Sequence, residues 1–305
     1  MNNLSSDNML KNYLHALIDN LDKDKIPKKL NIILDGGAFN GGYMYGILLY
    51  LKELENLNYT IIEKISGCSI GAVLGVFFLS NILEENINIY DDILSHFRKN
   101  HNLLNTRNIL TTSLEKIDLS LINDKIFINY YNITTMENVV VSHFENKEEL
   151  IEVLIRSAHI PYIIDGNILY KNKFLDGITP YIFPVSSGKT LYISSIIFNK
   201  LKYIFYLKNE VNIWTRLLTG VMDANSFFSN NDSEHCSYIN NWTMTNFILF
   251  RFREIITFFI ISVLYIFIYL NNKVPTEITS NIFILRFCSI LEMLYKNILN
   301  YVIIG

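Results

Sequence analysis

An α/β fold with a mostly parallel central sheet is predicted by two consecutive strand, glycine turn and helix units near the start of the chain. In the first unit, the apolar segment 30–34 runs into a glycine-rich turn, and the pattern of apolar residues predicts a helix over 43–57. In the second unit, a strand is expected over 60–65 and an apolar helix over 72–83, with a tight turn between them. Strands that alternate with helices favour a parallel sheet whose faces the helices cover.

The remaining elements follow from the same periodicities. Leucines at helical spacing predict an amphipathic helix over 10–21, and the polar, weakly periodic stretch 84–135 is expected to form a helical or loop insertion on the surface. Further elements are expected as strands at 139–142 and 190–198, a helix at 147–157, and a hairpin or strand at 167–175.

The last third of the chain has a different composition. Between Glu254 and Lys273 lie 18 uncharged residues, and the apolar part, 255–270, is compatible with either a membrane span or a buried helix. A second segment, 282–304, carries charges that suit an amphipathic helix at an interface. If 255–270 spans a bilayer, the arginines that precede it favour a cytosolic catalytic domain.

Three regions are therefore predicted: an N-terminal helix and linker (1–29), a catalytic domain (30–205) and a C-terminal helical region with a possible membrane segment (206–305). The chain has 305 residues, half of them apolar, and a net charge of −3 without basic clusters, which argues against nucleic-acid binding. Its three cysteines are far apart, and no metal-ligand spacing occurs, so neither a disulfide framework nor a metal site is expected. The polar N-terminus lacks the apolar core of a signal peptide, so secretion by that route is not expected.

The strongest candidate for chemistry is Ser69, in the G-x-S-x-G sequence from Gly67 to Gly71. A chain of this length shows such a pattern by chance roughly one time in ten. Its position between a predicted strand and an apolar helix is the context of a nucleophile elbow, where a sharp turn strains the serine backbone and presents its hydroxyl. The sequence therefore predicts a serine nucleophile.

A second glycine turn, at Gly36, Gly37 and Ala38, precedes the helix expected over 43–57. Backbone N–H groups at such a turn can stabilise an oxyanion. Glycine turns before helices also bind nucleotide phosphates, but neither G-x-G-x-x-G nor the P-loop Gly-Lys-Ser/Thr is present. An oxyanion hole is the favoured interpretation, and a purely structural turn is the alternative.

Four sequence blocks in order resemble the patatin-like phospholipases. They are the glycine-rich segment 34–46, the elbow 65–72, the segment 156–161 (Arg-Ser-Ala-His-Ile-Pro) and the Asp-Gly segment 174–178, which is followed by Pro184. Together they cover about residues 30–200.

The resemblance implies a three-layer α/β/α domain with a Ser69–Asp176 catalytic dyad, which calls for no cofactor. The apolar C-terminal helices, which lie beyond the resembling blocks, are expected to keep the enzyme at a bilayer. Asp176 would take the Ser69 proton and return it to the leaving alkoxide, aided by a short hydrogen bond and a water-poor site. This chain departs from the family at Ala38, usually glycine, at Asn40, usually Arg or Lys, and at Ile178, usually Gly or Ala. The oxyanion hole is expected to survive provided that φ of Ala38 stays negative.

A lipid acyl hydrolase acting on phospholipid or another acyl lipid is the resulting prediction. An α/β-hydrolase triad would require His235, which lies in a polar run that is expected to be a solvated loop, and His159 and Cys68 are expected to be structural. Two alternatives are a catalytically silent, membrane-associated protein that binds lipid or a partner, and a soluble esterase or thioesterase.

Overall fold

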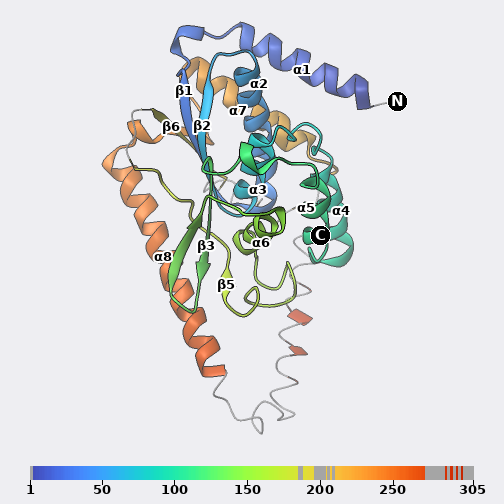
Figure 1. Cartoon of the computed structure of the whole chain (residues 1–305), viewed down its shortest axis with the longest axis vertical. Coiled ribbons are helices and arrows are strands. Elements are labelled where there is room, and N and C mark those ends of the chain that lie inside the picture. The colour runs from blue at the N-terminus through green and yellow to red at the C-terminus, as the bar shows by residue number, and fades with distance from the viewer. Residues whose placement is uncertain are drawn as a thin grey trace.

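The computed structural model describes residues 3–184, 188–195 and 210–271, together with a few single positions between and beyond these ranges. The described strands form one sheet of mixed type in the order β4-β3-β2-β1-β6-β7, with β5 paired to β3 (Figure 1). The strands are β1 (Lys29–Leu34), β2 (Ile61–Gly67), β3 (Ile126–Asn132), β4 (Glu137–Val141), β5 (Phe174–Leu175), β6 (Lys189–Ile193) and β7 (Cys236–Tyr238). The four central strands β3, β2, β1 and β6 are parallel, and β4, β5 and β7 pair antiparallel at the margins.

Helices cover both faces of this sheet. They are α1 (Asn3–Asp19), α2 (Gly41–Asn56), α3 (Ile70–Leu79), α4 (Ile89–Asn100), α5 (Thr106–Ser113), α6 (Lys147–Ser157), α7 (Trp214–Asn230) and α8 (Met244–Asn271). Figure 1 shows α2, α3 and α7 on one side of the sheet and α8 running along the other. The α/β class with a mostly parallel sheet, predicted from the two early strand and helix units, is therefore confirmed.

Strand β1 shows how the two faces are built. Leu30, Ile32 and Leu34 are fully buried in the large core shared with α2, α3 and α7, whereas Ile33 points to the opposite face. There Ile33 packs with Phe250 of α8. Because side chains alternate along a strand, this nearly continuous apolar run is what a strand covered on both faces requires.

The structure corrects the expectation for residues 84–135. This stretch contains β3, which pairs in parallel with β2 and buries Ile126 and Ile128, so part of it is central sheet and not a surface insertion. Its helices α4 and α5 also contribute buried residues, such as Phe97 and Leu110. The expected hairpin at 167–175 is reduced to the two-residue strand β5 and one bridge between Tyr170 and Phe174.

Elements after residue 205 are built into the same sheet and core. Helix α7 packs along α2, and β7 extends the sheet beside β6. The segment 255–270 forms the second part of α8, where Thr257 and Ile261 are buried while Ile255, Phe258 and Phe259 are more than half exposed. It is thus a helix lying on the surface of the sheet rather than a buried one.

Within the ranges described, no helix combines the length and the apolar character that crossing a membrane requires. The second apolar segment predicted at 282–304 lies outside the described residues, apart from single positions.

Candidate active site

Ser69 lies at a strained turn between β2 and α3. Its backbone has φ 53° and ψ −128°, a left-handed conformation that a serine rarely adopts. A Cβ atom at Gly71 would come within 2.6 Å of the carbonyl oxygen of Asp35, and one at Gly67 within 2.7 Å of the amide of Ala72. The turn can pass this close to β1 and α3 only because both neighbours are glycine, as the G-x-S-x-G spacing predicts.

Asp176, which follows β5, is brought beside Ser69 although 107 residues separate them in sequence. Burial raises the pKa of the Asp176 carboxyl, a hydrogen bond with the Ser69 side chain lowers it, and the net value is about 7. Its Oδ1 atom is shielded from solvent and has no hydrogen-bond partner among the described residues. A half-protonated carboxyl at neutral pH, in contact with a hydroxyl, is suited to accept and return a proton.

Ser157, at the end of α6, connects the loops that carry Ser69 and Asp176. Its Oγ accepts a hydrogen bond from the Ser69 amide at 3.0 Å and donates one to the Asn129 carbonyl of β3 at 2.7 Å. Its carbonyl oxygen accepts from the amide of Gly177 at 3.2 Å. The sequence placed Ser157 in a family-like segment, and the structure gives it a physical role in holding the two loops together.

The proposed oxyanion turn differs from the expectation in two respects. The Gly36 amide donates to its neighbour, the Oδ1 atom of Asp35, at 2.9 Å, so this N–H group is already used. Ala38 has φ 44°, so the condition set for the oxyanion hole, a negative φ at this residue, is not met, although the residue still supplies a backbone N–H group. Gly37 and Ala38 lead into a short 3₁₀ helix, 38–40, and amides at the start of a helix lack partners within it. These two amides are therefore the better candidates for donors.

Asn40 occupies a position where the patatin-like phospholipases usually carry Arg or Lys. It is buried, and its side chain contacts an arginine from another helix. The Arg216 guanidinium, from α7, donates to the Oδ1 atom of Asn40 at 2.9 Å, and the Asn40 amide donates to the Ser195 carbonyl at 2.9 Å. Arg216 is itself buried and pairs with Glu210 at 2.6 Å. A positive charge is thus supplied to this turn from a different part of the chain.

An apolar pocket opens beside Ser69. It encloses an empty volume of about 790 Å³ including its open mouth, and its lining is almost wholly apolar. The walls come from the elbow, from α3, α4 and α5, and from the segment after α6, with Phe77, Ile93, Ile109 and Ile163 among the lining residues. Ile93 and Ile109 could not be identified from the sequence as pocket residues, because the stretch 84–135 that contains α4 and α5 was expected to be a surface insertion.

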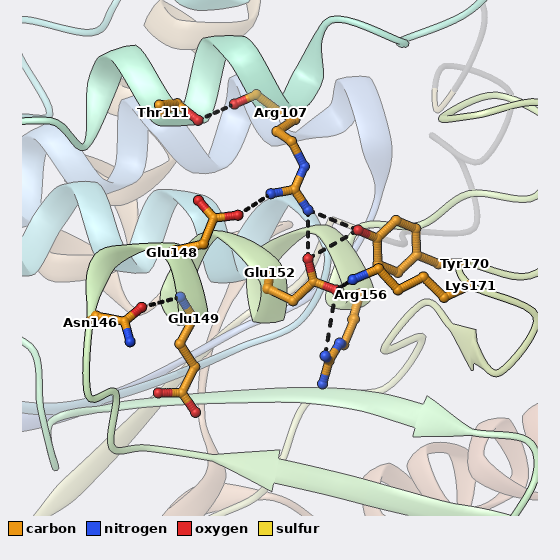
Figure 2. Close-up of polar contacts among 9 residues, drawn as sticks. All are labelled: Arg107, Thr111, Asn146, Glu148, Glu149, Glu152, Arg156, Tyr170 and Lys171. Carbon is orange, nitrogen blue, oxygen red and sulfur yellow. Dashed lines mark hydrogen bonds and ion pairs between the residues drawn. The ribbon is translucent and has the colours of Figure 1, made fainter.

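A network of charged side chains connects α5 to α6 and to the loop that carries Tyr170 and Lys171 (Figure 2). Arg107 of α5 pairs with Glu148 and Glu152 of α6, and Glu152 also accepts from Lys171 and from the Tyr170 hydroxyl. Burial raises the pKa of Glu152, but these hydrogen bonds outweigh it and lower the pKa to about 2. The network fixes α5, a wall of the pocket, against α6, the helix that ends at Ser157.

The histidines and Cys68 take no part in the contact between Ser69 and Asp176. The polar run 230–234 is mostly exposed, as expected for a solvated loop, but His235 at its end is buried. The His235 ring stacks on Tyr43, and its Nδ1 lies 2.8 Å from the Ser194 carbonyl. His159 is also fully buried, and burial lowers its pKa. Cys68 is a buried core residue, as expected. No cluster of three metal-ligating side chains occurs in the described part of the chain.

A serine on a strained strand-to-helix turn, a carboxyl partner and an adjoining apolar pocket are typical of α/β serine hydrolases that act on apolar esters. No protein-family model matches the chain. The chain is 27% identical over 213 residues to the mouse protein named 1-acylglycerol-3-phosphate O-acyltransferase Pnpla3. It is 28% and 27% identical over 143 residues to patatin-like phospholipase domain-containing protein 2 of mouse and rat.

These alignments cover 63% of the chain for Pnpla3 and 44% for the other two. The aligned part spans about half (51%) of the length of Pnpla3 and 29% and 30% of the others. The chain is thus a distant homologue of the patatin-like phospholipase domain proteins, and the resemblance found in its sequence is confirmed.

Proposed function

We propose that this protein is a lipid acyl hydrolase that cleaves fatty-acyl esters through a covalent acyl-enzyme on Ser69. One observation carries the proposal: Ser69, whose backbone is strained, lines an apolar pocket, and its hydroxyl contacts a carboxyl of pKa about 7. Homology to proteins whose names describe phospholipase domains and acyl transfer to a lipid supports the same substrate class.

The chemistry begins with attack by the Ser69 Oγ atom on the ester carbonyl carbon, while its proton passes to Asp176. The carbonyl oxygen becomes negatively charged, and the amides of Gly37 and Ala38 stabilise it. When the tetrahedral intermediate collapses, the bond to the alcohol breaks and Asp176 returns the proton to the leaving alkoxide. Water then attacks the acyl-enzyme with Asp176 again as base, and the fatty acid leaves.

The same site can transfer the acyl group to an acceptor other than water. The mouse Pnpla3 protein is named as an acyltransferase for 1-acylglycerol 3-phosphate, which gives this second candidate a specific acceptor. Hydrolysis and transfer share the acyl-enzyme and differ only in the molecule that deacylates it.

We further propose that the protein works at a lipid surface, with its catalytic domain in the cytosol. Helix α8 exposes a dense set of large apolar side chains, and Phe252, Ile255 and Phe259 are each more than half exposed. Exposed apolar patches of this kind are typical of membrane or protein contacts, and a helix that lies along the interface needs no span. Acyl lipids reside at such a surface, so the helix would keep the enzyme near its substrate.

The test is fatty-acid release from phospholipid vesicles by the wild type, Ser69→Ala and Asp176→Asn. The matched controls are Ser120→Ala and Asp124→Asn, which change an exposed serine and an exposed aspartate. We expect the first two variants to lose activity by about three orders of magnitude or more and the controls to keep it.

The substrate panel separates the alternatives. A wild type that releases no fatty acid from any acyl lipid, with or without 1-acylglycerol 3-phosphate as acceptor, would favour the catalytically silent binding protein. Equal rates on dispersed short esters and on vesicles would favour a soluble esterase or thioesterase.

A further inference from the structure

Helix α8 is attached to the body of the protein by one stripe of side chains, and a charged residue lies in the middle of that stripe. Phe250 packs against Ile33 of β1 and Tyr192 of β6, and Ile261 packs against Leu175 of β5. Between these two apolar contacts Arg253 turns inward, with only 22% of its side chain exposed. The sequence suggested this arginine as a flank of a possible membrane span, whereas the structure directs it into the candidate active site.

The guanidinium of Arg253 contacts both halves of the site. It forms a two-pronged ion pair with the Asp35 carboxylate, at 2.8 Å to Oδ2 and 2.5 Å to Oδ1, and it donates to the Ile178 carbonyl at 2.5 Å. Asp35 directly precedes the proposed oxyanion turn, and Ile178 lies two residues after Asp176. One side chain from α8 therefore bridges the loop of the oxyanion donors, at Gly37, and the loop of the base, at Gly177. These two loops are 140 residues apart in sequence.

The partner of Arg253 is placed to transmit this contact. Asp35 is fully buried, accepts from the Tyr192 hydroxyl at 3.0 Å, and accepts from the amide of Gly36 at 2.9 Å. The carboxylate thereby fixes the first peptide of the glycine turn. A bidentate arginine pair has a set geometry as well as strength, so it can hold the turn in one orientation.

Stability alone does not account for a buried ion pair at this position. Pairs of this kind are often no more stabilising than apolar residues of the same volume, although loss of a single partner is costly. Here the pair lies where geometry matters for reaction, because a displacement of about 1 Å in a reacting constellation can lower a rate by about 100-fold.

We propose that Arg253 is a positioning residue, through which helix α8 holds the oxyanion turn and the Asp176 loop in the arrangement that acyl transfer requires. This inference rests on the proposed function and adds to it: the catalytic arrangement depends on α8 being docked on the sheet. Since α8 also carries the exposed apolar surface, contact with lipid and assembly of the site involve the same helix.

The charges around Asp176 give the proposal a second readout. Asp35 raises the pKa of Asp176 and Arg253 lowers it. Cys68 is a titratable neighbour of Asp176, and Tyr192 is a titratable neighbour of Asp35 and Arg253. Removal of the arginine charge alone leaves Asp35 unbalanced, so the pH at which Asp176 becomes ionised must rise. Because the two charges shift the pKa of Asp176 in opposite directions, removal of both should move that pH less than removal of the arginine charge alone.

The experiment compares Arg253→Gln, Arg253→Lys and the double variant Asp35→Asn/Arg253→Gln with the wild type. The matched control is Arg251→Gln, on the same helix, whose side chain is 72% exposed and pairs only with Glu254 among the contacts described. Five quantities are measured: kcat and KM for a soluble acyl ester, the rate of Ser69 labelling by a fluorophosphonate, the midpoint of the pH profile of kcat/KM, and Tm.

We expect Arg253→Gln to lower kcat and the labelling rate by about 100-fold with a small change in KM, and to move the pH midpoint up by about one unit. Arg253→Lys should recover part of kcat. The double variant should return the midpoint toward the wild-type value while kcat stays low, and it carries the test if the single variant does not fold. Arg251→Gln should match the wild type throughout.

The inference is overturned if folded Arg253 variants lose only thermal stability and keep the wild-type kcat, labelling rate and pH midpoint. That result leaves the proposed function intact. A wild type that neither hydrolyses esters nor labels at Ser69 overturns the proposed function, and the inference with it, so the two failures are distinguishable.

Discussion

The pKa of Asp176 makes a quantitative prediction about pH. If Asp176 is the base, only its ionised form supports attack by Ser69, and its pKa is about 7 because burial outweighs the hydrogen bond from Ser69. A base of this pKa is about nine-tenths ionised one pH unit above the midpoint and about one-hundredth ionised two units below it. Acidification from pH 8 to pH 5 should therefore lower kcat/KM by about 100-fold, with a tenfold fall per unit below the midpoint.

The assay is the initial rate of alcohol release from a soluble acyl ester at substrate concentrations far below KM, with samples quenched and read at a single pH. Under these conditions the profile reports groups of the free enzyme. Circular dichroism at each pH controls for unfolding. A midpoint near the ordinary aspartate value of about 4, or a flat profile between pH 5 and pH 8, would refute the assignment of Asp176 as a buried base.

Three further predictions concern other parts of the site. Ala38→Gly should stabilise the protein by about 0.5–1 kcal/mol, because φ at residue 38 is 44°, which glycine adopts without strain. Ala158→Gly, at an ordinary φ of −106°, should destabilise the protein by a similar amount. Chemical denaturation measures both changes in the free energy of unfolding, and changes of the same sign would contradict the strain argument. Ile93→Trp, in the pocket wall, should raise KM for esters of long acyl chains by about tenfold and leave KM for short-chain esters unchanged. Leu104→Trp, outside the pocket lining, should change neither KM. An equal effect of Ile93→Trp on both chain lengths would exclude the pocket as the acyl site. Glu152→Gln should lower the free energy of unfolding by about 1–2 kcal/mol at pH 7, because the pKa of Glu152 is lowered in the folded state. This contribution to stability is present above the unfolded pKa of about 4.5 and is lost as the pH falls toward 2. Urea unfolding should therefore show a difference between variant and wild type that shrinks below pH 4, and a difference independent of pH would argue against the ion-pair network.

Much of the fold was predictable, because the early strand and helix units consist of elements that a few neighbouring residues are enough to identify. The apolar run of β1, the glycine turns and the apolar helix α3 each follow from the spacing of a few neighbouring residues. The same holds for α6, whose cap is visible in the sequence: the Asn146 side chain accepts a hydrogen bond from the amide of Glu149 at 2.9 Å. For the same reason the elbow at Ser69 was predictable from its two flanking glycines.

The features that the sequence did not reveal depend on contacts between distant segments. Strand β3 is a short run within a polar stretch, and its place in the sheet is decided by parallel pairing with β2. The left-handed backbone of Ala38 is imposed by the turn around it, since no local property of alanine favours it. Arg253 contacts Asp35, from which it is separated by 218 residues in sequence. From the sequence alone, Arg253 was interpreted as a charged residue flanking an apolar helix, and only the fold shows that it lies in the site.

The sharpest test of the account is whether Ser69 becomes covalently modified in a manner that depends on Asp176. Wild type, Ser69→Ala and Asp176→Asn are treated with a fluorophosphonate or an activated acyl ester, and the adduct is located by mass spectrometry of the peptide that spans the elbow. We expect one adduct, on Ser69, that is absent from Ser69→Ala and forms at least about 100-fold more slowly in Asp176→Asn. An adduct on another residue, or equal labelling of Ser69→Ala, would contradict it.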